Sequence, residues 1–377
     1  MVPRRVSLIL PLLVLPALIG CGQSAPVEPA PLDDAALSAV VERPGVSRRK
    51  LARAVDALFT AEGVGETRAV VVMHKGRIVA ERYGEGFTRD TRMVSWSMAK
   101  TVTAVMIGLL VSDGRLRLDE SAPVPVWQRA GDARGEITLR QLLQMRSGLH
   151  HVETADPVFD SDTVRMLFLD GRDDMAAYAE AQPLAAEPGR EFVYSSATSV
   201  ILADIAARAL TDSRDPAVRR RLVGDYLRTR LFEPLGATSM QPEFDAAGTL
   251  IGGSLIHGTA RDWAKFGEFM RRGGTTVGGA QIIPRVWIEF MTKPSPRNRG
   301  YGAQVWLNRP QPEGQDEVLF PDEAPASLFA SIGHLGQYVI VSPAQDLTVV
   351  RLGKTNDAAR TPLREKLADL VSLFPRG

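Results

Sequence analysis

The stretch from residue 94 to residue 111 reads VSWSMAKTVTAVMIGLLV and is the most informative part of the chain. Ser97 and Lys100 are three positions apart, which places both side chains on one face of a helix. Residues 102 to 111 are apolar nearly all round, as is typical of a buried helix. Because burial disfavours a charged amine, we expect a lowered pKa for Lys100, and a neutral lysine beside a hydroxyl is a competent general base. The stretch predicts a buried serine–lysine pair.

The same spacing occurs a second time, at Ser47 and Lys50, so spacing alone is weak evidence. The second pair is flanked by arginines and begins an exposed helix, which favours a structural role. For Ser97 and Lys100, the alternative is a helix cap with a lysine that extends toward solvent.

A tyrosine precedes another apolar helix. Tyr194 lies in the loop segment PGREFVYSS, residues 188 to 196, ahead of apolar residues 200 to 210. A lysine ammonium nearby would favour the phenolate, so we expect Tyr194 to pass a proton to a leaving group. The alternative is a half-buried core tyrosine whose hydroxyl completes a hydrogen bond.

The segment GHLGQ, residues 333 to 337, precedes a predicted strand. Glycine allows a backbone to approach a substrate closely. We expect the N–H of Gln337, at a sheet edge, and the N–H of Ser97 to form an oxyanion hole, with His334 as a binding side chain. The alternative is a glycine turn with an exposed histidine.

Strand-like segments occur at both ends of the globular part, and helix-like segments lie between them. The early segments 69–73 and 77–83 indicate a hairpin. Short turns separate the late strand segments, and such turns require antiparallel pairing. The late segments are 304–307, 328–332, 337–341 and 347–352.

This arrangement predicts an α+β fold. An antiparallel sheet built from the N- and C-terminal segments is flanked by helices, and a mainly helical region is inserted. The globular part is expected over residues 46–377. Its α/β portion would comprise residues 46–95 and 260–377, and its helical portion residues 96–259.

The N-terminal residues indicate export. Arg4 and Arg5 precede an apolar run, residues 7 to 19, that is too short to span a bilayer. The run ends Leu18-Ile19-Gly20-Cys21, which resembles a bacterial lipobox. That resemblance implies a signal peptide over residues 1–20 and a lipid on Cys21. The alternatives are a plain secretory signal with an incidental cysteine, or a short anchor that is not cleaved.

The residue after the cysteine bears on location. Gly22 rather than Asp follows Cys21, which by resemblance to Gram-negative sorting favours a periplasm-facing lipoprotein of the outer membrane. Residues 21–45 are rich in proline and alanine and are expected to form a flexible tether to the membrane.

Composition limits the possible partners. Of 377 residues 45% are apolar, so a sizeable core is available, and a net charge of +1 provides no field for nucleic acid. The single cysteine forms neither an intramolecular disulfide nor a cysteine-rich metal site. His150 and His151, with Glu153 and Asp156, lack a second cluster that would complete a metal site. We therefore expect no metal and no cofactor.

Taken in order, a set of motifs resembles the serine β-lactamase-like hydrolases, in particular the class C-like family VIII esterases and 6-aminohexanoate-dimer hydrolases. The likeness runs from about residue 47 to the C-terminus. The motifs are SMAK (97–100), LLQMRSGL (142–149), EPGREFVYSS (187–196), LFEPLGATSM (231–240), GGSLIHGTARDWAKFG (252–267) and GHLGQY (333–338).

The resemblance implies roles for these residues. Ser97 would be the nucleophile, Lys100 its base, and Tyr194 the tyrosine of the family's Tyr-x-Asn motif. Ser196 stands where the family often has asparagine, and His334-Leu335-Gly336 stands in the place of Lys-Thr-Gly. Ser196, His334, Leu335 and Gly336 are accordingly expected to bind substrate.

The departures bear on the substrate. Replacement of Lys-Thr by His334-Leu335 removes a cation and a hydroxyl that would hold a β-lactam carboxylate. The sequence therefore favours a lipid-anchored serine hydrolase that cleaves an ester or a small amide. The alternatives are a β-lactamase or D-alanyl-D-alanine carboxypeptidase-like enzyme, and a non-catalytic cell-envelope binding protein on the same fold. The acyl group, the leaving group and the oligomeric state stay open.

Overall fold

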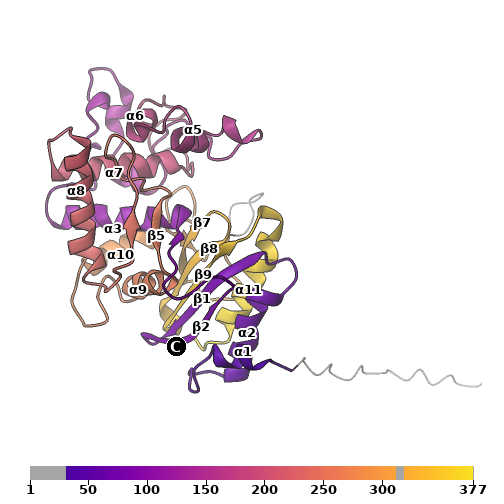
Figure 1. Ribbon diagram of the computed structural model, residues 1–377. Coiled ribbons are helices and arrows are strands. Elements are labelled where there is room, and N and C mark those ends of the chain that lie inside the picture. Colours follow the sequence, from indigo (N-terminus) through magenta and orange to yellow (C-terminus); the bar gives the residue numbers. More distant parts are fainter. Residues whose placement is uncertain (1–30, 311–317, 377) are drawn as a thin grey trace, which may run out of the picture.

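A six-stranded antiparallel sheet forms the centre of the structure, a computed structural model that describes residues 31–310 and 318–376 (Figure 1). The spatial order of its strands is β2-β1-β9-β8-β7-β6. The strands are β1 (Glu66–His74), β2 (Arg77–Tyr83), β6 (Trp306–Leu307), β7 (Phe329–Gly333), β8 (Gln337–Ser342) and β9 (Leu347–Lys354). The first strand pairs with the last, so both ends of the fold build the sheet and the predicted α+β class is confirmed.

Alternate residues of β1 enter two separate cores. Val70 and Val72 belong to the core on one face of the sheet, and Ala69, Val71 and Met73 belong to the core on the other. Successive side chains of a strand point to opposite faces, so a continuous apolar run fits a strand that is covered on both sides.

Helices cover both faces of the sheet (Figure 1). Helices α2 (Arg48–Thr60) and α11 (Arg360–Ser372) pack together on one face, and α9 (Ala260–Arg271) packs on the other. The Ser47 hydroxyl caps α2 by accepting the Lys50 N–H. The second serine–lysine pair is therefore a helix start, as its arginine-rich flanks predicted.

The inserted region is mainly helical and lies beyond α9 (Figure 1). Its longest helices, α3 (Ala99–Ser112) and α7 (Ser196–Leu210), pack against each other. The other helices outside the sheet layers are α4 (Leu139–Leu143), α5 (Asp162–Phe168), α6 (Met175–Glu180), α8 (Pro216–Leu227) and α10 (Arg285–Met291). A small second sheet has the order β3-β5-β4, with β3 (Met93–Val94), β4 (Gln241–Pro242) and β5 (Ile256–Gly258).

Residues 31–45 are ordered, so the prediction that the tether extends to residue 45 is wrong for this part. Helix α1 (Asp34–Ser38) is followed by Val40, which forms a β-bridge to Ala80 of β2 and is only 2% exposed. The Arg48 guanidinium donates to the Val40 and Leu37 carbonyls. A few apolar residues suffice to fix this segment, because Val40 joins a core that the sheet and its helices already form. Cys21 and the signal peptide lie outside the described residues.

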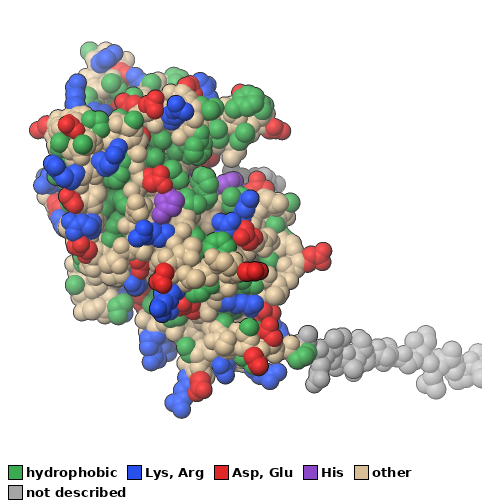
Figure 2. Space-filling model, viewed as in Figure 1, with side chains coloured by type: hydrophobic (Ala, Val, Ile, Leu, Met, Phe, Trp, Pro, Cys, Tyr) green, Lys and Arg blue, Asp and Glu red, His purple; other side chains and the backbone are tan. Residues whose placement is uncertain are grey.

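Basic and acidic side chains are interspersed on the face shown in Figure 2, in keeping with a net charge of +1. This face carries no field of a single sign that would attract a polyanion. Within residues 31–310 and 318–376, no helix combines the length and the apolar character needed to cross a membrane.

Candidate active site

Ser97 and Lys100 meet where the sheet adjoins the helical region. Residues Trp96–Met98 form a short 3-10 turn that contacts β7 and β8, and α3 follows directly. The turn begins with Trp96 at φ +47°, a left-handed conformation that bulky residues rarely adopt. The Lys100 Nζ atom donates a hydrogen bond to the Ser97 Oγ atom at 2.8 Å. The structure thus brings together the pair that the three-residue spacing suggested.

Lys100 is enclosed by oxygen atoms. Its side chain is 1% exposed, and its Nζ atom also donates to the Ser196 Oγ atom and to the Gly253 carbonyl, each at 2.8 Å. Burial lowers the pKa of Lys100 to about 8, against the opposing effect of the Glu153 charge. A substantial fraction of the amine is therefore neutral at mildly alkaline pH.

Gly253 allows this close packing. A Cβ atom at this position would lie 2.7 Å from the Ser196 carbonyl oxygen, so a side chain would force the two segments apart. The pair Gly252-Gly253, which sequence reasoning did not connect with catalysis, thereby supplies a carbonyl acceptor for Lys100.

Tyr194 lies over the amine, with its ring centroid 4.8 Å from the Lys100 Nζ atom. Burial, together with the Glu153 charge, raises the pKa of Tyr194 well above its usual value, and a hydrogen bond with Ser97 opposes this only in part. The prediction of a favoured phenolate is therefore wrong. The main reason is burial, which disfavours the charged phenolate, and the charge of Glu153, absent from the prediction, adds to it.

Glu153 lies in the candidate site and was not predicted there from the sequence. Its carboxylate accepts the Ser196 O–H at 2.6 Å and the Ser196 N–H at 2.8 Å. Burial alone would raise the pKa of Glu153, but the hydrogen bond with His151 and the charge of Lys100 outweigh burial and lower it to about 2. From the sequence, Glu153 was considered only as a metal ligand together with His150 and His151. Its contact with Ser196 spans 43 positions, and local spacing does not reveal such a contact.

Ser196 makes internal contacts that the sequence did not predict. It is the first residue of α7 and is 1% exposed, and its hydroxyl accepts from Lys100 and donates to Glu153. Ser196 therefore links the amine and the carboxylate inside the protein. Its contact with substrate stays a prediction.

Gln337 begins β8, an interior strand, so the expected sheet-edge position is corrected. Its side-chain amide donates to the carbonyls of His334, Leu335 and Gly353. These bonds fix the turn between β7 and β8. A Cβ atom on Gly333 in this turn would lie 2.1 Å from the Ser95 carbonyl oxygen, so the turn approaches the nucleophile segment closely. The oxyanion hole from the Ser97 and Gln337 N–H groups stays a prediction.

The remaining turn residues differ in their freedom to meet a ligand. His334 is exposed, and its ring meets the Trp96 ring edge-on at 5.4 Å. Leu335 is half-buried with φ +59°, and the Gly336 carbonyl accepts from Arg351. His334 is therefore the residue of this turn whose side chain is best placed for a substrate contact.

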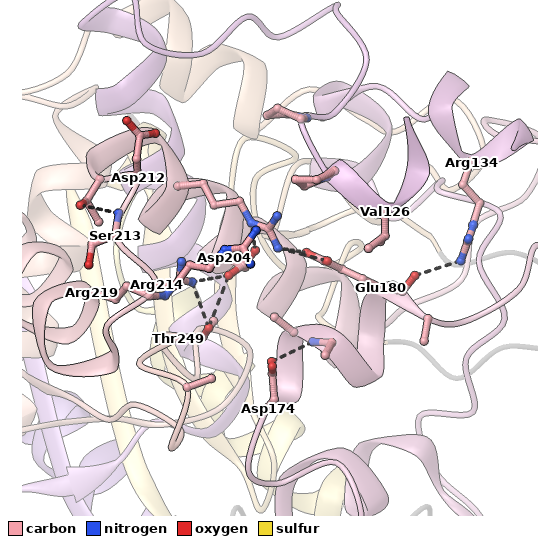
Figure 3. A pocket seen from close by; sticks show the side chains of 18 of the residues that line it. Val126, Arg134, Asp174, Glu180, Asp204, Asp212, Ser213, Arg214, Arg219 and Thr249 are labelled. Carbon is pink, nitrogen blue, oxygen red and sulfur yellow. Dashed lines mark hydrogen bonds and ion pairs between the residues drawn. The ribbon is translucent and has the colours of Figure 1, made fainter. Parts of the chain in front are cut away.

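A cavity of about 930 Å³ lies elsewhere and does not include Ser97, Lys100 or Tyr194 (Figure 3). Ion pairs between its own residues line it. Arg208 lies 3.2 Å from Glu180 and also pairs with Asp204, which binds Arg219. The carboxyl and guanidinium groups of this cavity bind one another, and the contact between Lys100 and Ser97 lies outside it. We therefore place the candidate active site at Ser97.

The family model described as Beta-lactamase matches residues 48–372. Among curated proteins, the 6-aminohexanoate-dimer hydrolase of Paenarthrobacter ureafaciens is 28% identical over 232 residues. That alignment covers 59% of this chain and 56% of the relative, so the chain matches little more than half the length of that protein.

Similar solved structures include a putative 6-aminohexanoate-dimer hydrolase from Bacillus anthracis, with a TM-score of 0.63 and 19% identity over 82% of this chain and 81% of the other. A family VIII carboxylesterase has a TM-score of 0.62 and 19% identity over 86% of this chain and 96% of the other. At these identities the likeness concerns the fold.

Proposed function

Because the chain belongs to the beta-lactamase family, we propose that this serine hydrolase cleaves an ester or a small amide through an acyl-enzyme on Ser97. The observation that carries the proposal is the 2.8 Å contact between the Lys100 Nζ and Ser97 Oγ atoms, in surroundings that lower the pKa of the amine to about 8. A base with that pKa is neutral often enough near neutral pH to accept the serine proton.

The proposed acylation starts from the contact between Lys100 and Ser97. The Ser97 Oγ atom attacks the carbonyl carbon while its proton moves to the Lys100 Nζ atom. The N–H groups of Ser97 and Gln337 hold the oxyanion, a type of contact worth about 3 kcal/mol per donor. The protonated amine then supplies a proton to the leaving group through the neutral Tyr194 hydroxyl. Water cleaves the acyl-enzyme by the reverse sequence.

The turn after β7 supports a substrate without a carboxylate beside the scissile bond. His334-Leu335 offers neither the fixed cation nor the hydroxyl of Lys-Thr. The names of the relatives, a hydrolase of the 6-aminohexanoate dimer and a carboxylesterase, support an amide or an ester. The family match keeps a β-lactam as the second candidate.

Active-site labelling tests this proposal. The purified protein is incubated with a fluorescent fluorophosphonate and then assayed on a panel of esters and small amides. We expect a label that Ser97→Ala abolishes and turnover of at least one panel member. A protein that the fluorophosphonate does not label at Ser97 would be a binding protein on this fold. Label by a fluorescent penicillin with no ester or amide turnover would favour the β-lactam candidate.

We also propose that the enzyme is a lipoprotein held at the outer membrane by a lipid on Cys21, facing the periplasm. The support is the sequence of residues 4 to 22. Metabolic labelling with an alkyne fatty acid in a Gram-negative host should mark the wild type and not Cys21→Ser. An unlabelled wild type in the soluble periplasmic fraction would contradict the anchor.

A further inference from the structure

A continuous chain of hydrogen bonds leads from the Lys100 amine to Glu153. The Lys100 Nζ atom donates to the Ser196 Oγ atom at 2.8 Å, and the Ser196 hydroxyl donates to the Glu153 Oε1 atom at 2.6 Å. The other carboxylate oxygen accepts from the Ser196 N–H, from His151 and from Thr163, at 2.8, 2.8 and 2.9 Å. Glu153 is thus held as an ionised acceptor of four hydrogen bonds.

The direction of these bonds follows from the chemistry of the groups. An ionised carboxylate only accepts, so the single Ser196 O–H proton points to Glu153. The Ser196 oxygen must then accept a proton from Lys100. The Gly253 carbonyl also only accepts, and it takes a second N–H of the amine at 2.8 Å. A neutral amine has two N–H groups, so the remaining tetrahedral position, its lone pair, faces Ser97.

We propose that Glu153 is a positioning residue that sets the direction of the hydrogen bonds around Lys100 and so aims the lone pair of the amine at the Ser97 hydroxyl. This inference rests on the proposed function, because it describes the base of that reaction. Glu153 acts through Ser196 and does not touch the substrate. Ser196 stands where the family often has asparagine. Its single O–H proton is donated to Glu153, so its oxygen is left to accept a hydrogen bond from Lys100.

The charged and titratable groups around Lys100 are few. Glu153 raises the pKa of the amine, and the Tyr194 ring lies over it at 4.8 Å. Tyr301 packs edge-on to Tyr194 at 5.8 Å, and His151 lies behind Glu153 with its Nε2 atom on the carboxylate. The segment that carries Gly253 contributes a neutral carbonyl. Removal of the Glu153 charge therefore changes the main electrostatic support of the protonated amine.

The test is the pH dependence of kcat/KM for Glu153→Gln in the full-length protein. The carboxamide N–H₂ can donate to the Ser196 oxygen, which frees the Ser196 proton to turn toward the lone pair of Lys100. We expect the plateau of kcat/KM to fall roughly 10- to 100-fold, as for loss of one hydrogen bond to a charged group. The acid limb of the profile, where kcat/KM rises with pH, should move to lower pH, because the charge that raised the pKa of Lys100 is gone.

Two further variants separate the effects. Ser196→Ala keeps the charge of Glu153 and breaks the link, so its plateau should fall while its acid limb moves less than that of Glu153→Gln. Asp160→Asn removes an exposed carboxylate further along the same loop, and both its plateau and its acid limb should match the wild type. A purely structural role of Glu153 would lower the plateau or the melting temperature without moving the acid limb.

The outcomes are distinguishable from failure of the proposed function. If the wild type shows no Ser97-dependent label or turnover, the proposed function fails first. If the wild type is active and Glu153→Gln keeps both its plateau and its acid limb, the inference is overturned. If Glu153→Gln does not fold, Ser196→Ala decides: a plateau within about threefold of the wild type would overturn the inference, because a broken link should cost as much as a lost hydrogen bond.

Discussion

Lys100 experiences two opposing influences, and burial outweighs the charge of Glu153. The resulting pKa of about 8 means that the amine loses its proton as the pH rises through that value. Because the base acts in its neutral form, kcat/KM should rise with pH through about 8 and then level off. Stopped or continuous assays between pH 5.5 and 9.5 measure this, and a rate that is flat from pH 6 to pH 9 would remove Lys100 as the base.

Replacement of the amine gives the complementary test. Lys100→Met keeps a linear side chain without a base, and kcat/KM at pH 8 should fall roughly 10²- to 10⁴-fold. Lys50→Met is the matched control, because this lysine has the same spacing from a serine but is exposed at the start of α2. The control should retain wild-type turnover, and equal losses in both variants would contradict the assignment.

Spacing in the sequence revealed the local contact of Lys100 but not its distant contacts, and Tyr194 and Ser196 were assigned to the site through the family resemblance. Ser97 and Lys100 are joined by a bond across three positions, which helical spacing reveals. The bonds that Lys100 makes to Ser196 and Gly253 cross 96 and 153 positions. No periodicity reports such contacts, so the neutral Tyr194 and the role of Glu153 required the structure.

At the scale of elements, α3 and α10 approach each other at a glycine. A Cβ atom on Gly108 would lie 2.3 Å from the Trp287 Nε1 atom, which donates to the Ala104 carbonyl. Gly108→Ala should lower the free energy of unfolding by about 1–3 kcal/mol, because overpacking outweighs the gain in helix propensity. Chemical denaturation measures the change.

Gly224 in α8 provides the matched control. A Cβ atom there meets its nearest neighbour, Phe244, at an ordinary 3.8 Å. Gly224→Ala should therefore stabilise the protein by up to about 1 kcal/mol through helix propensity alone. Equal effects at both glycines would show that α10 does not pack on α3 as described.

The Glu180 carboxyl, which lies beside Arg208 and Asp204 of α7, predicts a second stability effect (Figure 3). Burial and the neighbouring Asp204 raise the pKa of the Glu180 carboxyl despite the charge of Arg208. An acid whose pKa is raised by folding stabilises the native state most at low pH and loses that contribution as the pH rises above its unfolded value of about 4.3. Glu180→Gln stays neutral, so its free energy of unfolding should decline less than that of the wild type between pH 5 and pH 8.

Denaturation curves at several pH values check this, with Glu187→Gln, an exposed carboxylate, as the control. The control should follow the wild-type pH dependence. A Glu180→Gln variant that follows it too would show that Glu180 is already ionised at pH 5.

The elements that the sequence predicted are those with enough residues to show a period. Strands β1, β2, β7, β8 and β9 were expected close to their observed bounds, and helices α3 and α7 were expected at the apolar runs of residues 102–111 and 200–210. The strands of the second sheet have two or three residues, too few for alternation to be visible. Their pairing, such as Val94 with His257, depends on tertiary contacts alone.

At the scale of the whole molecule, the fold begins earlier than its hydropathy suggests. Val40 is 2% exposed and its neighbour Val41 is 44% exposed, so the two make a matched pair. Val40→Ala should lower the free energy of unfolding by about 1–3 kcal/mol through loss of buried apolar volume. Val41→Ala should change it by less than about 0.5 kcal/mol, as is usual at the surface.

The same measurement on truncated chains extends the test. A chain that begins at residue 46 lacks α1 and the bridge to Ala80, so its melting temperature should be lower than that of a chain that begins at residue 31. Equal melting temperatures of the two truncated proteins would restore the view that residues 31–45 are only a tether.

The pairing of β1 with β9 has a consequence for biosynthesis. His74 faces Leu347, so the ribosome must add almost the whole chain before β1 gains its second neighbour. Until then the early hairpin exposes apolar side chains on both faces and has no core to join, and a chain with such distant contacts folds slowly. A nascent polypeptide that closes its sheet late stays unfolded for longer, as the proposed export through a channel for unfolded chains would require.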